Sequence, residues 1–388
     1  MKFLHTADLH LGRYIYEKSL IDDQKHILDG LLTILADKSF DALLIAGDVY
    51  DRMAPGPDAV SLFGSFLGTL KRERPDIAVL VIPGNHDSPA RLGFGSSLFS
   101  ALGLHFVTDV ENAAQPVMVR DTAFFMLPFV PAEAVKTAAE TLENARLAAL
   151  KNGAKRCVLG AHLFGMGGHS SDSERIFIGT AEKVDVNLFA RFDYVALGHL
   201  HRYQKAGENA WYAGSPLAYS FDEAGGVNAD PAKKFFLQVE LEENRPPVVT
   251  PLEIEPLHKM RRLSGDFEYF YNKQDALLRE AENDYLELQL TGDHLVTQPA
   301  NLLASYYPHI LTITQTAALR MLTEAQRKNS VLMRNAEEEG AQNIKDDFAA
   351  FLEDLYGDRD ENNGAAFAEK TRLFNEIRKE IEAEEAAQ

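Results

Sequence analysis

The stretch Leu43–Arg52, LLIAGDVYDR, passes from an apolar run into polar and charged residues. Its first four residues are apolar without alternation, which predicts a strand covered on both faces. A glycine and two carboxylates, Asp48 and Asp51, follow at once. Because the polar residues begin where the strand stops, the pattern predicts a ligand site at the carboxyl end of a buried strand.

Similar apolar runs recur over the first two hundred residues: KFLHTA, DALLIA, IAVLVI, CVLGA and DYVALG. Helical patterns cover residues 22–36, 58–71 and 131–151, where apolar residues recur at helix spacing. Strands that alternate with helices predict an α/β layered domain. The runs AWYAGSP and KKFFLQVEL predict an antiparallel continuation, and we expect the domain to end near residue 257.

The remainder of the chain has a different character. In residues 258–320, the strand-like runs YLELQLTG and HILTITQ flank a short helix predicted at 299–305, which indicates a small α+β unit. Residues 321–388 carry nine Lys and Arg against seventeen Asp and Glu. We expect a polar linker there, followed by two amphipathic helices with apolar stripes within 344–355 and 367–381.

The composition and net charge of the chain limit the classes of protein to which it can belong. The 388 residues are 46% hydrophobic, enough for real cores, and carry a formal charge of -19. Such a charge repels phosphate backbones, so a nucleic-acid role requires bound cations or basic loops. The single cysteine, Cys157, lies in an apolar run and fits a core residue in a reducing compartment. We find neither a signal-peptide nor a membrane-helix pattern and expect a soluble cytoplasmic protein.

Polar residues follow five of the predicted strands in the same way. Any one of these placements occurs often by chance, but five segments share the form of an apolar strand followed by potential ligands. The carboxyl ends of strands in an α/β sheet meet at one edge, so we expect one shared site. Its candidate residues are Asp8, His10, Asp48, Asn85, His86, His162, His199 and His201.

Five motifs follow one another along the chain in the order D-x-H, G-D-x-x-D, G-N-H-D, H and G-H-x-H. With these motifs, residues 1–220 resemble the calcineurin-like metallophosphoesterases. The stretches HTADLHLGR, GDVYD, PGNHDSPARL and GHLHRYQ are also similar to the SbcD-type nucleases of bacteria. The resemblance implies a layered αββα nuclease domain at 1–257. It also implies a small capping, DNA-binding domain at 258–320 and a partner-binding helical tail at 321–388.

The resemblance further implies two metal ions that share one carboxylate. Asp8, His10, Asp48 and His201 would hold one ion, and Asp48, Asn85, His162 and His199 the other, with Asp48 as the bridge. Mixed carboxylate, amide and imidazole donors suit Mn²⁺ or iron better than Mg²⁺. The family's use of Mn²⁺ makes it the expected ion, with zinc as the competing occupant.

Other roles carry over from the same resemblance. His86 corresponds to the general acid that protonates the departing oxygen, and Asp51 fits as the carboxylate that raises the pKa of His86. Archaeal relatives carry histidine at the place of Asp51. Arg13, Arg52 and Arg91 directly follow metal motifs and could pair with phosphate oxygens.

Two partners are implied as well. A homodimer face would be formed by two sets of apolar residues: Phe63, Phe66 and Leu67 on one helix, and Phe94, Leu98 and Phe99 after His86. The alternative is that these residues pack on the sheet of their own chain. The tail would dock on the coiled coil of the ABC-type ATPase SbcC, or else fold back on the small unit.

We therefore expect a metal-dependent DNA nuclease that acts with this ATPase in DNA repair, recombination and replication. It would be an exonuclease on duplex ends and an endonuclease on single strands and hairpins. A phosphatase or small phosphodiesterase of the same superfamily is the alternative enzyme. A non-catalytic scaffold is the third hypothesis, and its mark would be a missing ligand; none of the motif residues is missing.

Overall fold

The computed structural model describes residues 1–165, 183–243, 245–273, 275–317 and 369–374. The chain divides into two compact units, Met1–Gln315 and Thr316–Gln388. Of the two predicted tail helices, the first lies outside the described residues, and of the second only residues 369–374 are described and are helical. Within the described ranges, no helix is long and apolar enough to cross a membrane.

The first sheet of the larger unit has six strands in the order β14-β13-β1-β4-β5-β6. The central strands β1, β4, β5 and β6 are parallel, and β13 runs antiparallel to both β1 and β14. The bounds are β1 Lys2–Thr6, β4 Ala42–Ala46, β5 Ala78–Ile82, β6 Leu104–Phe106, β13 Lys234–Glu240 and β14 Val248–Ile254.

The second sheet also has six strands, in the order β11-β12-β10-β9-β8-β7. Its strands are β7 Val117–Val119, β8 Thr122–Leu127, β9 Arg156–His162, β10 Tyr194–Gly198, β11 Gln204–Lys205 and β12 Ala210–Tyr212. The antiparallel continuation predicted for AWYAGSP is wrong, because β11 folds back onto β12 and β12 therefore runs parallel to β10. The prediction for KKFFLQVEL, which forms β13, is confirmed.

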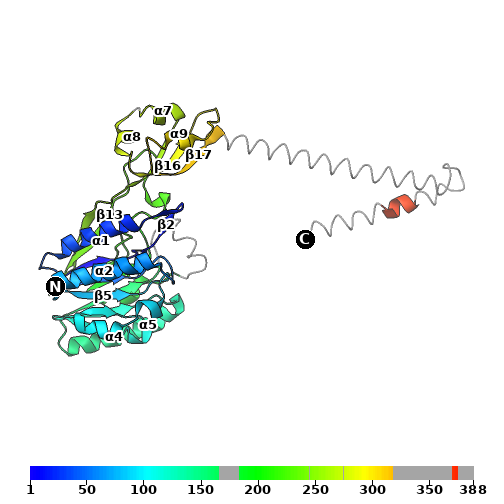
Figure 1. Ribbon diagram of the computed structural model, residues 1–388. Coiled ribbons are helices and arrows are strands. Elements are labelled where there is room, and N and C mark those ends of the chain that lie inside the picture. The colour runs from blue at the N-terminus through cyan, green and yellow to red at the C-terminus, as the bar shows by residue number, and fades with distance from the viewer. Residues whose placement is uncertain (166–182, 244, 274, 318–368, 375–388) are drawn as a thin grey trace, which may run out of the picture. The chain divides into compact units, whose positions relative to one another are not determined.

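Helices cover the outer faces of the two sheets (Figure 1). Two helices, α1 Ile21–Leu35 and α2 Pro57–Glu73, pack on the first sheet. The helix α5 Ala132–Lys151 packs on the second sheet. Between the sheets lies a third apolar layer that includes Phe3, Leu44, Phe124 and Tyr194. The predicted αββα layering and the three long helices are thus confirmed. Short segments α3 Pro89–Leu92 and α4 Ser96–Phe99 follow β5.

A smaller sheet follows, with β15 Met260–Gly265, β16 Tyr285–Leu290 and β17 Ile310–Gln315 all parallel. The segments α7 Phe267–Tyr271, α8 Ala276–Glu280 and α9 Pro299–Leu303 connect these strands. Its α+β character confirms the sequence reading, which missed β15. Asp23 of α1 accepts hydrogen bonds from His258 Nδ1 at 2.9 Å and Tyr285 Oη at 2.7 Å. A domain boundary at residue 257 stays a prediction, because residues 1–315 form one compact unit.

Candidate metal centre

The polar loops after β1 and β4 run side by side beyond the ends of these strands. The backbone N–H of Asp8 donates to the Gly47 carbonyl at 3.0 Å, and that of His10 donates to the Asp48 carbonyl at 3.0 Å. Asp8, His10 and Asp48 all have positive φ angles, of 55°, 43° and 50°. Non-glycine residues in that region are strained, and such strain gathers at functional sites.

Two glycines allow an unusually close approach at this sheet edge. Gly47 has a φ of +93°, and a Cβ placed on it would lie 2.2 Å from His162 Nδ1. A Cβ on Gly84 would lie 2.1 Å from Asp48 Oδ1. The glycines of the G-D and G-N-H motifs are therefore required so that ligand side chains can lie against the backbone.

The second sheet supplies histidines to the same place. His162 ends β9, and His199 and His201 follow β10. Asn85 Oδ1 lies 3.0 Å from His162 Nε2 and 3.0 Å from His199 Nδ1. Asp48 Oδ2 lies 3.5 Å from His162 Nε2.

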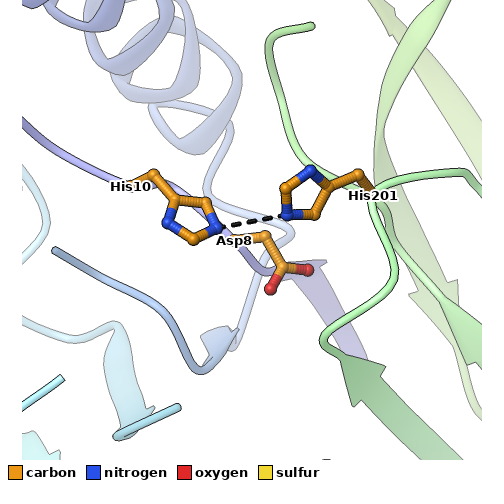
Figure 2. Close-up of side chains that lie close together, drawn as sticks. All are labelled: Asp8, His10 and His201. Atoms are coloured by element: carbon orange, nitrogen blue, oxygen red, sulfur yellow. Dashed lines mark hydrogen bonds between the residues drawn. The ribbon is translucent and has the colours of Figure 1, made fainter. Parts of the chain in front are cut away.

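Asp8, His10 and His201 contribute a second group of ligand atoms (Figure 2). His10 Nε2 is 3.2 Å from His201 Nε2 and 3.6 Å from Asp48 Oδ2. Ligand atoms of Asp8, His10 and His201 all lie within 4.8 Å of one another, as do those of Asp8, Asp48 and His162. The same holds for His10, Asp48 and His86.

These separations fit metal coordination. Neighbouring ligands of an octahedral ion at about 2.1 Å lie about 3.0 Å apart. The predicted ligands that this arrangement brings together are Asp8, His10, Asp48, Asn85, His162, His199 and His201. Their donor set of carboxylate, amide and imidazole atoms fits divalent cations.

The electrostatics of the cluster favour the metal-binding forms of its histidines. Burial lowers the pKa of His162 to about 3, and it lowers the pKa values of His10 and His199 well below the ordinary value. All three are therefore neutral near pH 7, which leaves a ring nitrogen with a free electron pair. Burial raises the pKa of Asp48 to about 6, although the charge of His86 opposes this.

Hydrogen bonds with groups outside the ligand set orient the imidazole rings of His162 and His201. The other nitrogen of His162, Nδ1, lies 2.9 Å from the Ala46 carbonyl oxygen. His201 Nδ1 lies 3.0 Å from Oε1 of Glu223, a residue that the sequence reasoning missed. Burial would raise the pKa of Glu223, but the charges of Lys234 and His201 and their hydrogen bonds lower it well below its usual range. No motif spacing points to Glu223 or Lys234, since only folding brings them to His201.

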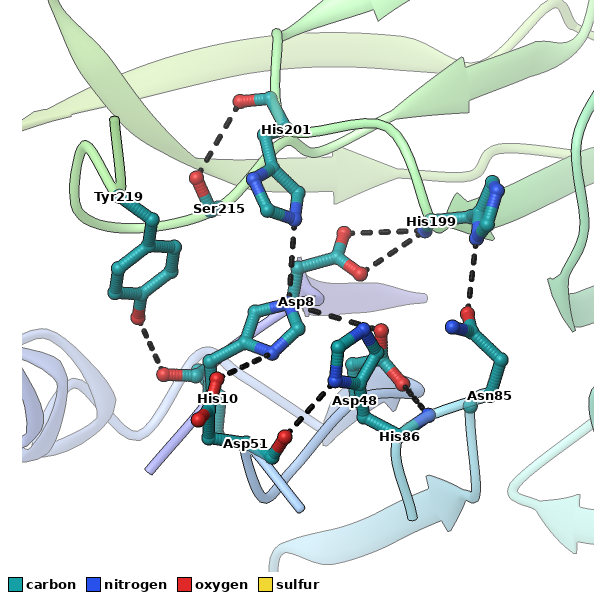
Figure 3. A network of polar contacts seen from close by, with 12 residues as sticks. Asp8, His10, Asp48, Asp51, Asn85, His86, His199, His201, Ser215 and Tyr219 are labelled. Atoms are coloured by element: carbon teal, nitrogen blue, oxygen red, sulfur yellow. Dashed lines mark hydrogen bonds and ion pairs between the residues drawn. The ribbon is translucent and has the colours of Figure 1, made fainter. Parts of the chain in front are cut away.

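His86 lies beside Asp48 and is half-buried (Figure 3). Its Nδ1 lies 2.9 Å from the backbone carbonyl oxygen of Asp51, and its ring packs edge-on against His10 at 4.7 Å. The Asp51 carboxylate instead binds Arg13 at 2.7 Å, because the guanidinium offers it a charged donor. The expectation that the Asp51 carboxylate supports His86 stays a prediction.

The three predicted arginines differ in their placement. Arg13 is tied to Asp51 and lies over the Tyr219 ring at 5.3 Å. Arg52 Nε is 3.6 Å from Asp51 Oδ2, and its side chain is mostly exposed. Arg91 lies exposed on α3. Arg13 and Arg52 therefore share one carboxylate beside the cluster.

The comparisons with known proteins agree with this geometry. A family model described as calcineurin-like phosphoesterase matches residues 1–203, and one described as type 5 capsule protein repressor C-terminal domain matches residues 256–355. The SbcD subunit of the nuclease SbcCD from Staphylococcus epidermidis (strain ATCC 12228 / FDA PCI 1200) is 34% identical over 327 residues, 81% of this chain and 85% of that protein.

A crystal structure of TT1561 of Thermus thermophilus is similar over 66% of this chain and 99% of its own. Its sequence identity is 12% and its TM-score is 0.38, which establishes no shared fold.

Two stacked sheets that meet at a buried cluster of carboxylate, amide and imidazole groups define a phosphoesterase, and the chain belongs to the calcineurin-like phosphoesterase family. Within that family it is a homologue of the SbcD subunit of the nuclease SbcCD, a phosphoester hydrolase of the nuclease class.

Proposed function

We propose that this chain hydrolyses DNA phosphodiesters with two divalent cations held at the strand ends. It would degrade duplex ends as an exonuclease and cut single strands and hairpins as an endonuclease. The observation that carries the proposal is the convergence of seven potential ligands from five separate segments, with Asp48 between the two groups.

In this proposal Asp8, His10, Asp48 and His201 hold one cation, and Asp48, Asn85, His162 and His199 hold the other. Mn²⁺ is the proposed ion, since it accepts nitrogen and oxygen donors together, whereas Mg²⁺ prefers oxygen. When bound, two such cations supply a positive clamp for a phosphate group and activate a water molecule.

The chain's own residues would position and protonate the substrate. His86 has Nδ1 fixed by the Asp51 carbonyl at 2.9 Å, so its Nε2 is the atom that would carry a proton to the departing sugar oxygen. Asp51 would act through Arg13 and also lies 3.7 Å from His10 Nδ1. Arg13, Arg52 and the exposed Arg91 would contact phosphate oxygens.

Binding of DNA by the chain alone is expected to be weak. Its formal charge of -19 opposes the approach of a polyanion, and the proposed cations offset this only near the cluster. The staphylococcal relative is, by its name, one subunit of a complex called SbcCD. We propose that this chain likewise acts with an SbcC-type ABC ATPase in the cytoplasm, and that residues 321–388 bind its coiled coil.

A homodimer is also proposed, on a smaller face than the sequence suggested. Phe63, Phe66 and Leu67 are buried on their own sheet, so the alternative packing holds for α2. After His86, however, Phe94 is 82% and Leu98 75% exposed. These two side chains, with the exposed Phe99 and Leu102 nearby in the sequence, would suit contact with a second copy of the chain.

The experiment that tests the proposed activity compares two substrates. Metal-free protein is given Mn²⁺ and either end-labelled duplex and hairpin DNA or a chromogenic phosphodiester. We expect both to be cleaved, with both activities lost in Asp48→Ala and DNA cleavage reduced about 10²–10⁴-fold in His86→Ala. The exposed His294→Ala serves as the matched control. Cleavage of the small ester alone would favour the alternative phosphodiesterase.

A further inference from the structure

Glu223 is a buried carboxylate that contacts His201 from outside the ligand set. It ends the short helical turn Phe221–Glu223 and is 2% exposed. Its Oε1 accepts from His201 Nδ1 at 3.0 Å, and its Oε2 accepts from Lys234 Nζ at 2.7 Å. The carboxylate therefore links a ring of the metal cluster to a lysine at the start of β13.

Lys234 is itself held in one position by three acceptors. Besides Glu223, its ammonium group donates to the His201 carbonyl oxygen at 3.0 Å and to Ser215 Oγ at 2.8 Å. An ammonium group has three N–H donors, and here each has a partner. The lysine thus fixes both the carboxylate and the backbone of the residue that the carboxylate orients.

One histidine of each ligand group, His201 and His162, has a different kind of acceptor at its outer ring nitrogen. His201 has a charged acceptor behind it, whereas His162 has the neutral carbonyl oxygen of Ala46 at 2.9 Å. A carboxylate acceptor forms a stronger hydrogen bond than a carbonyl and makes the opposite ring nitrogen a more basic ligand. The same physics predicts stronger metal binding on the His201 side.

We infer that Glu223, held by Lys234, is a positioning residue that orients His201 and selectively strengthens the cation site of Asp8, His10 and His201. This inference rests on the proposed two-metal site. An ion pair that served only the fold would make a different prediction, because its loss would not distinguish between the two cations.

The test measures manganese binding directly. Mn²⁺ is titrated into the metal-free full-length protein, with binding followed by calorimetry and by the electron paramagnetic resonance signals of free ions and of coupled manganese pairs. For the unmodified chain we expect two binding steps. In Glu223→Gln the tighter step should weaken about 10–100-fold, while the other changes less than about threefold. The coupled-pair signal should then require correspondingly more Mn²⁺.

The adjacent lysine, Lys233, and its ion-pair partner provide matched controls. Lys233 and Glu253 form an exposed ion pair at 2.7 Å, so Lys233→Met and Glu253→Gln should leave both steps unchanged. Lys234→Met should weaken the tighter step about tenfold, since it frees the carboxylate that orients His201. Circular dichroism will show whether each variant is folded. If Glu223→Gln is not folded, Lys234→Met tests the positioning role of Glu223 in its place.

Two results would overturn the inference. If folded Glu223→Gln binds both ions with unchanged affinity, or loses both steps equally, Glu223 has no selective positioning role. If the unmodified chain binds no Mn²⁺, the proposed two-metal function fails first and this inference with it. The titration of the unmodified protein therefore separates the two failures.

Discussion

The backbone of Gly47 lies directly against the imidazole ring of His162, so that a Cβ at Gly47 would be 2.2 Å from Nδ1. The positive φ of +93° adds backbone strain for any other residue, of about 1–3 kcal/mol. We predict that Gly47→Ala displaces His162 and abolishes Mn²⁺ binding, measured by calorimetry. In the exposed middle of α2, a Cβ on Gly64 meets nothing within 4 Å. Gly64→Ala should leave Mn²⁺ binding intact and stabilise the fold by about 0.5–1 kcal/mol.

Metal binding should depend on the protonation of Asp48. Burial raises its pKa to about 6, so below that pH a proton competes with the cation for this carboxylate. Burial lowers the pKa of His162 to about 3, so this ring is already neutral and adds no competing proton near pH 6. The apparent Mn²⁺ affinity should therefore be nearly level above about pH 7 and fall about tenfold between pH 7 and pH 5. An affinity that does not change between pH 5 and pH 7 would contradict this assignment.

Much of this site could be predicted because its residues follow strands in short motifs. Asp8, Asp48 and His162 each come directly after an apolar run, and parallel strands must bring such residues to one edge. The αββα layering followed from the family resemblance. The strand β8, Thr122–Leu127, was not recognised although it is buried within the second sheet. A short apolar run cannot be identified as a strand by its periodicity alone.

The unpredicted parts of the site depend on tertiary contacts. Glu223 and Lys234 are eleven positions apart, and folding brings Lys234 Nζ to 2.7 Å from Glu223 Oε2. The ion pair between the Asp51 carboxylate and Arg13, at 2.7 Å, was not predicted either. Such choices among neighbouring donors are made by side-chain geometry, which residue spacing does not specify.

The contact between α1 and the small sheet should contribute to stability without affecting the metal site. Tyr285→Phe leaves one oxygen of the buried Asp23 without its hydrogen bond of 2.7 Å, which should cost about 1–3 kcal/mol in urea unfolding. The Mn²⁺ affinity should not change. Tyr14→Phe, at an exposed position, should alter neither quantity. If Tyr285→Phe were as stable as the parent chain, this hydrogen bond would not hold the two parts together.

The exposed patch after His86 predicts the assembly of the chain. Leu98 is 75% exposed, and Leu98→Asp would place a charge in the centre of an apolar contact. We expect light scattering at micromolar concentration to show a dimer for the parent chain and a monomer for this variant. Leu188→Asp, at another exposed position, should remain dimeric. A parent chain that is monomeric in this measurement would refute the dimer face.

The central claim is that Asp48 bridges two cations between Asp8, His10 and His201 on one side and Asn85, His162 and His199 on the other. Anomalous scattering from crystals grown with Mn²⁺ tests it most directly. We expect two manganese peaks about 3.5–4 Å apart, with an Asp48 oxygen bound to both. A cluster without manganese, or two ions that do not share Asp48, would contradict it.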